Sequence, residues 1–177
     1  GISGGIDSSV VLALCARAFG PQRVVGILLP ERESSPESAD LAYELAQCYG
    51  VEAFPEEISD ALYGFGCYPR RDEAIQRVIP EYQPGWNTKI VLPGDLMERA
   101  SLNLFSLVVP SPDGVAYRKR LPPVEYRQIV ASSNFKQRTR MSMLYYHAEL
   151  RNYAVIGTAQ KNEHDRGFFV KYGDGGS

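Results

Sequence analysis

The feature that most constrains the fold is a glycine-containing loop, Ser3-Gly4-Gly5-Ile6-Asp7-Ser8, placed directly before an apolar run of helical length. Residues 10–16 of that run are almost entirely apolar, which predicts a helix that is buried on most sides and stops near Gly20. Two glycines let the backbone approach an anion closely, and the amides at the start of a helix point toward it. The sequence therefore predicts an anion-binding loop that opens a buried helix.

Helix and strand patterns alternate after this loop. Residues 23–29 form a β-branched and leucine-rich run closed by a proline, which is typical of a buried parallel strand. We expect a second helix over residues 40–50 and a short strand over residues 51–54. This alternation predicts an α/β fold with a doubly wound parallel sheet, whose first strand would lie just before Gly1.

The middle of the chain is less regular, and we expect residues 61–133 to form an excursion from the α/β order. Within it, residues 101–109 and 115–121 are predicted to be the two arms of a hairpin. The sequence Pro112-Asp113-Gly114 between them is a turn signal.

The last third of the chain returns to the α/β pattern. Residues 124–151 have helical periodicity, in which Asn134 is a candidate interruption. Residues 153–157 are predicted to be another buried strand, and Thr158 is predicted to begin a long polar loop.

Composition and charge exclude several classes of protein. A formal net charge of -2 argues against a dedicated nucleic-acid-binding protein, and no apolar run is long enough to cross a membrane. We interpret the basic clusters at residues 70–71, 118–120 and 136–140 as solvated faces. The three cysteines are far apart and form no metal-ligand spacing, which predicts free thiols in a reducing cytoplasm.

The polar residues of the first loop suit a phosphate group. Ser3, Ser8 and Ser9 can donate hydrogen bonds to phosphate oxygens. Asp7 would repel a phosphate unless a magnesium ion lay between them. No Gly-Lys-Ser/Thr sequence follows, so this is not the common P-loop motif. A tight turn that only caps a helix is the alternative interpretation.

The loop resembles the Ser-Gly-Gly-x-Asp-Ser signature of the ATP pyrophosphatases, and three later segments resemble NAD synthetases. Residues 134–141 are similar to the Asn-x-x-x-Arg-x-Arg-Met segment of that family. Residues 157–163 are similar to its Gly-Thr-x-x-x-x-Glu loop, and residues 167–175 to its Gly-Phe/Tyr-Phe-x-Lys-Tyr-Gly-Asp stretch. The resemblance therefore covers both ends of the chain.

The resemblance implies the adenine nucleotide alpha hydrolase-like fold, in one domain over residues 1–177 that is a fragment truncated at both ends. It also implies three groups of site residues. These are Thr158, Lys171 and Asp174 for catalysis, Asp7 and Glu163 for magnesium, and Ser3, Gly4, Gly5, Asp7, Ser8, Ser9, Leu29 and Arg138 for nucleotide binding. Surface pairing with acids is an equal alternative for Arg138.

The activity implied is ATP-dependent amidation of nicotinic acid adenine dinucleotide to NAD through an acyl adenylate, with ATP and Mg²⁺ required. Ammonia would be the second substrate, the assembly a homodimer and the location the cytoplasm, without nucleic-acid or membrane partners. A paralogue that amidates another carboxylate and a non-catalytic nucleotide-binding module are the alternatives. A sulfur-transfer enzyme acting on tRNA fits less well, because the cysteine pairs and basic surface of that class are lacking.

Overall fold

The computed structural model describes residues 1–92 and 105–176. The chain divides into two compact units. The first comprises Gly1–Phe65 and Asn134–Ser177, and the second comprises Gly66–Ser133. Within the described residues, no helix is both long and apolar enough to cross a membrane.

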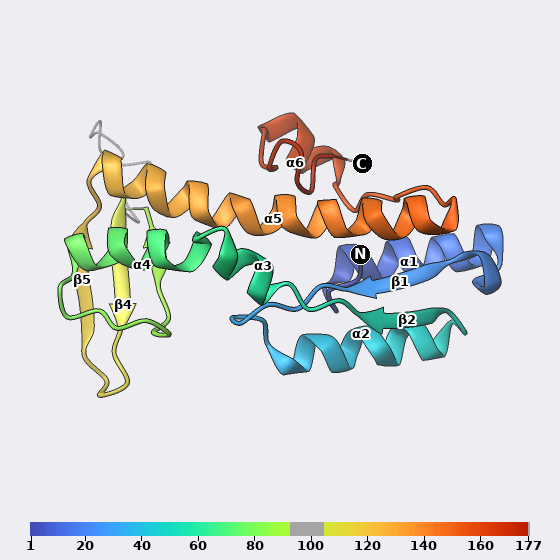
Figure 1. The fold of residues 1–177 in the computed structure, drawn as a ribbon, viewed down its shortest axis with the longest axis horizontal. Helices are drawn as coiled ribbons and strands as arrows, with labels where there is room; N and C mark the ends of the chain where they lie inside the picture. The colour runs from blue at the N-terminus through green and yellow to red at the C-terminus, as the bar shows by residue number, and fades with distance from the viewer. Residues whose placement is uncertain (93–104, 177) are drawn as a thin grey trace. The chain divides into compact units, whose positions relative to one another are not determined.

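The first unit is built on a parallel α/β core. Its elements up to residue 65 are α1 (Ile6–Phe19), the short 3₁₀ helix η1 (Pro21–Arg23), β1 (Val25–Leu28), α2 (Pro36–Cys48), β2 (Glu52–Pro55) and α3 (Ser59–Gly64). β1 and β2 pair in parallel, from Val25 opposite Glu52 to Leu28 opposite Pro55. Figure 1 shows the two strands side by side, with α2 along one side of the pair. The predicted order of helix, strand, helix and strand is confirmed, and so is the α/β class.

Helix α1 is buried on one face only, so the prediction of burial on most sides is wrong. Leu12 and Ala16 belong to the core that α1 forms with α2 and β1. In contrast, Ile6, Val10 and Leu14, spaced four residues apart, are 74%, 49% and 60% exposed. Composition alone misled the prediction, because burial depends on which faces meet a partner and not on how many side chains are apolar.

Helix α2 begins four residues before the predicted start. Pro36 occupies its first turn, where a missing N–H costs no intrahelical hydrogen bond and the fixed φ suits the helix. Ala42 and Ala46, one turn apart, are fully buried against the strands. Small side chains at these positions allow the helix to lie close to the sheet.

The last long helix, α5, runs from Pro123 to Arg151 without a break, so Asn134 does not interrupt it. The segment from Thr158 onward is not the continuous loop that the sequence predicted. It contains the short helix α6 (Lys161–Arg166), which begins with a capping box between Gln160 and Glu163.

The predicted strand over residues 153–157 is wrong. These residues form no strand, and Tyr153 and Ile156 are 43% and 46% exposed. Both line a cavity of about 400 Å³ that is also lined by Val25 and Ile27 of β1. Strands pair only when their backbones lie about 4.8 Å apart. Among the described residues no strand pairs with residues 153–157, and an apolar sequence cannot replace that pairing.

The second unit is an antiparallel sheet with helices. Its elements are α4 (Cys67–Val78), β3 (Lys89–Val91), β4 (Ser106–Pro110), β5 (Ala116–Arg120) and the beginning of α5. The sheet order is β3-β4-β5. The predicted hairpin is confirmed in β4 and β5, whereas residues 101–104 of its first arm lie outside the described residues. Gly114 in the turn has a φ of 81°, which explains the glycine.

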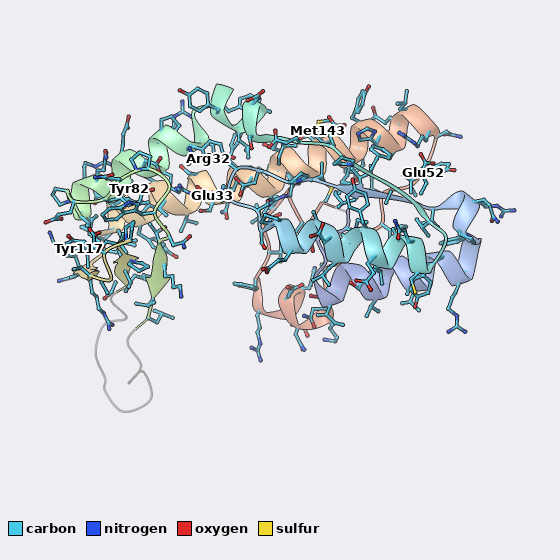
Figure 2. All side chains as sticks on the ribbon, turned by 90° about the horizontal axis from the view of Figure 1, so that it is seen from below. Arg32, Glu33, Glu52, Tyr82, Tyr117 and Met143 are labelled. Carbon is cyan, nitrogen blue, oxygen red and sulfur yellow. The ribbon has the colours of Figure 1, made fainter. Side chains whose placement is uncertain are left out.

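A buried polar group lies within the core of the second unit. Arg71 and Asp72 form an ion pair of 2.9 Å, and Tyr82 donates a hydrogen bond of 2.9 Å to the same carboxylate. Burial, followed by the hydrogen bond to Asp72, raises the pKa of Tyr82 to about 12. Tyr82 also lies in the same aromatic cluster as Tyr117 (Figure 2), which stacks on Trp86. The interpretation of all basic clusters as solvated faces is therefore wrong for Arg71.

Candidate functional site

The first loop is closed by its own serine side chains. Ser8 Oγ donates to the carbonyl of Gly5 at 3.0 Å and accepts from the backbone N–H of Ser3 at 3.2 Å. Ser9 Oγ donates to the same Gly5 carbonyl at 2.8 Å. The loop is therefore held around the beginning of α1, where the first N–H groups have no acceptor within the helix.

Gly4 is required by its backbone and by its surroundings. Its φ is 75°, in the left-handed region that other residues rarely adopt. A Cβ atom at this position would lie 2.5 Å from the backbone oxygen of Ser38 in α2. The first loop thus packs directly on the backbone of α2, which fixes its position.

A cavity of about 450 Å³ lies beside the loop, entirely within the first unit. It gathers residues from the first loop, the end of β1, the loop that follows, α5 and the C-terminal segment. Of the predicted site residues, it is lined by Ser3, Asp7, Ser8, Leu29, Thr158, Glu163 and Asp174. Gly4, Gly5, Ser9, Arg138 and Lys171 do not line it. The cavity thus brings together members of each predicted group from distant parts of the chain.

The end of β1 forms one wall of the cavity. Leu28 and Leu29 are buried, and both line the cavity together with Pro30. Arg140 of α5 donates through Nε to the carbonyl of Leu29 at 3.3 Å and also lines the cavity. Arg140 therefore ties the strand end to α5 on the cavity wall.

Asp7 and Glu163 both face this cavity, although they are 156 positions apart in the sequence. The Glu163 carboxylate accepts a hydrogen bond of 3.1 Å from the backbone N–H of Gln160, which fixes it at the start of α6. Among the described residues, no group of three or more histidine, cysteine or carboxylate side chains is arranged to hold a metal ion. Two carboxylates nevertheless suit Mg²⁺, which keeps several waters and takes other oxygens from substrate phosphates.

The remaining predicted catalytic residues lie on the C-terminal segment. Asp174 is half-buried, and its Oδ1 accepts a hydrogen bond of 3.0 Å from the N–H of Val170. Lys171 is exposed, with its ammonium group 5.0 Å from the centre of the Tyr172 ring. Arg138 donates through Nε to the carbonyl of Lys171 at 3.1 Å. In this structure Arg138 thus holds the backbone of the segment on α5.

Reasoning from the sequence missed several residues of the cavity wall, three of them on α5. Gln137, Met141 and Leu144 of α5 all line the cavity. Their spacing of four and three residues places them on one face of the helix, and this spacing could have identified them as one surface. The signal was overlooked because an amphipathic face does not reveal whether it meets a core or a cavity.

Comparison with known proteins agrees with this geometry. The family model described as NAD synthase matches residues 1–76 and 113–177. The NH(3)-dependent NAD(+) synthetase of Rhizobium meliloti (strain 1021) is 49% identical over 175 residues, which are 99% of this chain and 52% of the relative. The chain thus spans about half the length of the curated relatives it matches.

Solved structures give the same fold. The NH3-dependent NAD synthetase of Campylobacter jejuni, in complex with the nitrate ion, is 26% identical with a TM-score of 0.58. The likeness covers 98% of this chain and 51% of that one. The glutamine-dependent NAD+ synthetase of Acinetobacter baumannii, in complex with ADP, has a TM-score of 0.61 at 21% identity. It covers 98% of this chain and 23% of that one.

The parallel α/β core, with the glycine loop ahead of its first helix, therefore places the chain in the adenine nucleotide alpha hydrolase-like class of folds. Within that class, the chain belongs to the NAD synthase family.

Proposed function

We propose that the protein containing this chain amidates nicotinic acid adenine dinucleotide to NAD at the expense of ATP. The substrate carboxylate attacks the α phosphorus of ATP, pyrophosphate leaves, and ammonia then displaces AMP from the acyl adenylate. Family membership and the activity for which the Rhizobium meliloti relative is named support this proposal. The observation that carries it is the one cavity lined by Ser3, Asp7, Thr158, Glu163 and Asp174.

The first loop would bind the triphosphate of ATP. Gly4 and Gly5 would shape the loop so that the phosphates reach the helix start, whose free N–H groups and dipole favour an anion. Ser3, Ser8 and Ser9 would supply hydroxyl groups. Leu29 lines the cavity at the end of β1, which suits it to contact the adenine, since ligands bind at the carboxyl ends of parallel strands.

Asp7 and Glu163 would hold Mg²⁺. Both residues line the cavity, which serine and threonine residues also line, and oxygen ligands of these kinds fit this ion. Bound magnesium supplies positive charge that screens the triphosphate from the attacking carboxylate and stabilises the leaving pyrophosphate. Thr158 would contact the α phosphate or the adenylate from the same wall.

The C-terminal segment would exclude water from the reactive adenylate. Gly167, with a φ of 65°, and residues 173–176 could hinge such a movement. Lys171 would enter the site with this movement. Arg138 would contact the nucleotide phosphates once its bond to the Lys171 carbonyl is exchanged.

Asp174 would receive ammonium and accept its proton, releasing ammonia as the nucleophile. We expect Asp174→Asn to slow amidation more than adenylate formation, measured as NAD formation against pyrophosphate release. Asp165→Asn is the matched control, because that carboxylate lies on α6 outside the cavity lining. Equal loss of both steps in Asp174→Asn would reject the role.

The proposal includes a homodimer in the cytoplasm and no nucleic-acid partner. The family resemblance supports the dimer. Three free cysteines fit a reducing compartment, and the net charge of -2 does not favour nucleic acid.

The test is to incubate the full-length protein with ATP, magnesium, ammonium and nicotinic acid adenine dinucleotide, and to follow NAD and AMP by mass spectrometry. Equal amounts of NAD and AMP are expected. AMP and pyrophosphate without NAD would contradict the amidation step. ATP binding without any AMP would indicate a paralogue that acts on a different carboxylate.

A further inference from the structure

An ion-pair group joins α5 to the loop that follows β1. Lys136 Nζ lies 3.0 Å from Glu31 Oε1 and 2.6 Å from Glu33 Oε2, across more than 100 positions of sequence. The side chains of Lys136 and Glu31 are only 13% and 5% exposed. Charges removed from water interact strongly and tolerate the loss of a partner poorly. The prediction that the basic cluster at residues 136–140 is a solvated face is therefore wrong for Lys136.

The loop held by Lys136 forms one wall of the cavity. Pro30, Ser34 and Ser35 line the cavity, whereas Glu31 and Lys136 do not. Glu31 and Ser34 close the loop into a turn: the Ser34 N–H donates to the Glu31 carbonyl at 2.8 Å, and the Glu31 N–H donates to Ser34 Oγ at 3.0 Å. The position of the Glu31 side chain therefore influences the position of Ser34, which lines the cavity.

The same face of α5 holds the loop at a second point. Arg140 lies four residues after Lys136, so both side chains project from one face of the helix. Arg140 binds the carbonyl of Leu29, and Lys136 binds the carboxylates two and four residues further along the loop. Figure 2 labels Glu33 on this loop, next to Arg32. Two cationic anchors thus set the distance between the loop and the helix across the cavity.

We infer that Lys136 is a positioning residue for ATP: it fixes the cavity wall of residues 30–35 at the distance that the nucleoside of ATP requires. Without the ammonium group, the Glu31 carboxylate loses this attraction to α5, and the turn that Glu31 forms with Ser34 shifts with it. The inference rests on the proposed function, because ATP must bind in this cavity. Since Lys136 does not line the cavity, it acts on binding through the loop and not on the reacting atoms.

The test compares variants of the full-length protein in steady-state kinetics and in calorimetric titration with ATP and magnesium. Lys136→Met, which keeps the length of the side chain, should raise the Kd and KM for ATP about tenfold and leave kcat at saturating ATP within about twofold. Lys136→Arg retains the charge and should restore most of the affinity. Lys119→Met is the control, since Lys119 is an exposed lysine of β5 in the second unit.

The outcomes separate this inference from the proposed function. Wild-type protein that binds no ATP refutes the proposed function. Wild-type binding with unchanged affinity in Lys136→Met refutes the positioning role. A fall in kcat equal to the rise in KM, or no rescue by arginine, also refutes it. If Lys136→Met does not fold, Glu31→Gln decides: weaker ATP binding supports the role, and unchanged binding overturns it.

Discussion

Replacing Gly4 by alanine tests the geometry of the first loop most directly. The φ of 75° costs a residue with a Cβ atom about 1–2 kcal/mol. The new Cβ would lie 2.5 Å from the Ser38 backbone oxygen, so α2 or the loop must move by about 0.5 Å or more. Overpacking of this kind adds about 1–3 kcal/mol, because neither partner is the end of a flexible side chain. We therefore expect Gly4→Ala to lower the free energy of unfolding by about 2–5 kcal/mol.

The matched control is Gly114→Ala, in the hairpin turn of the second unit. Gly114 has a φ of 81°, and no atom lies within 4 Å of a Cβ placed there. It therefore measures the backbone cost alone, about 1–2 kcal/mol. Urea unfolding of both variants gives the two stability losses, and titration with ATP measures the effect on the cavity, which Ser38 lines. Equal stability losses, together with unchanged ATP affinity in Gly4→Ala, would refute the claim that contact with Ser38 positions the loop.

Three further predictions concern stability. Because the pKa of Tyr82 is raised from 10 to about 12, the folded state holds this proton more tightly; the contribution is complete below pH 10 and is lost as the pH rises to about 12, and Tyr82→Phe should abolish this part of the pH dependence in urea unfolding. Ser8→Ala removes bonds to Ser3 and Gly5 and should cost about 1–3 kcal/mol in the same assay, whereas an unchanged midpoint would contradict the importance of these bonds. Leu107 is fully buried, and its replacement by alanine should lower the free energy of unfolding by about 2–5 kcal/mol in the same assay. A decrease of less than about 1 kcal/mol would contradict the prediction that a cavity remains in the core of the second unit.

Local patterns predicted much of the first unit. The strand over residues 23–29 was identified because a strand buried on both faces favours a β-branched and leucine-rich run. The strand over residues 51–54 and the helices were identified from the alternation of patterns and from the glycine and proline residues that end elements locally. The hairpin of the second unit was predicted by its turn residues for the same reason. The motif residues that line the cavity were found by resemblance, and the roles assigned to them stay predictions.

Other features could not be predicted from neighbouring residues. The chain over residues 153–157 is as apolar as a buried strand, yet a strand exists only when another backbone lies within hydrogen-bonding distance. Asn134 suggested a break in α5, but one residue of low helix propensity costs less than tertiary packing gives.

The sequence by itself determined the alternation of helices and strands in the first unit, the position of one buried strand, and which segments carry the motifs of the family. These properties depend on covalent geometry and on neighbours along the chain. Only the tertiary structure decided which face of α1 is buried, that Asp7 and Glu163 share one cavity, and that Lys136 is paired with Glu31 and is not a fully solvated charge. Burial and charge pairing depend on atoms that are distant in sequence, and their positions are set only when the whole unit packs.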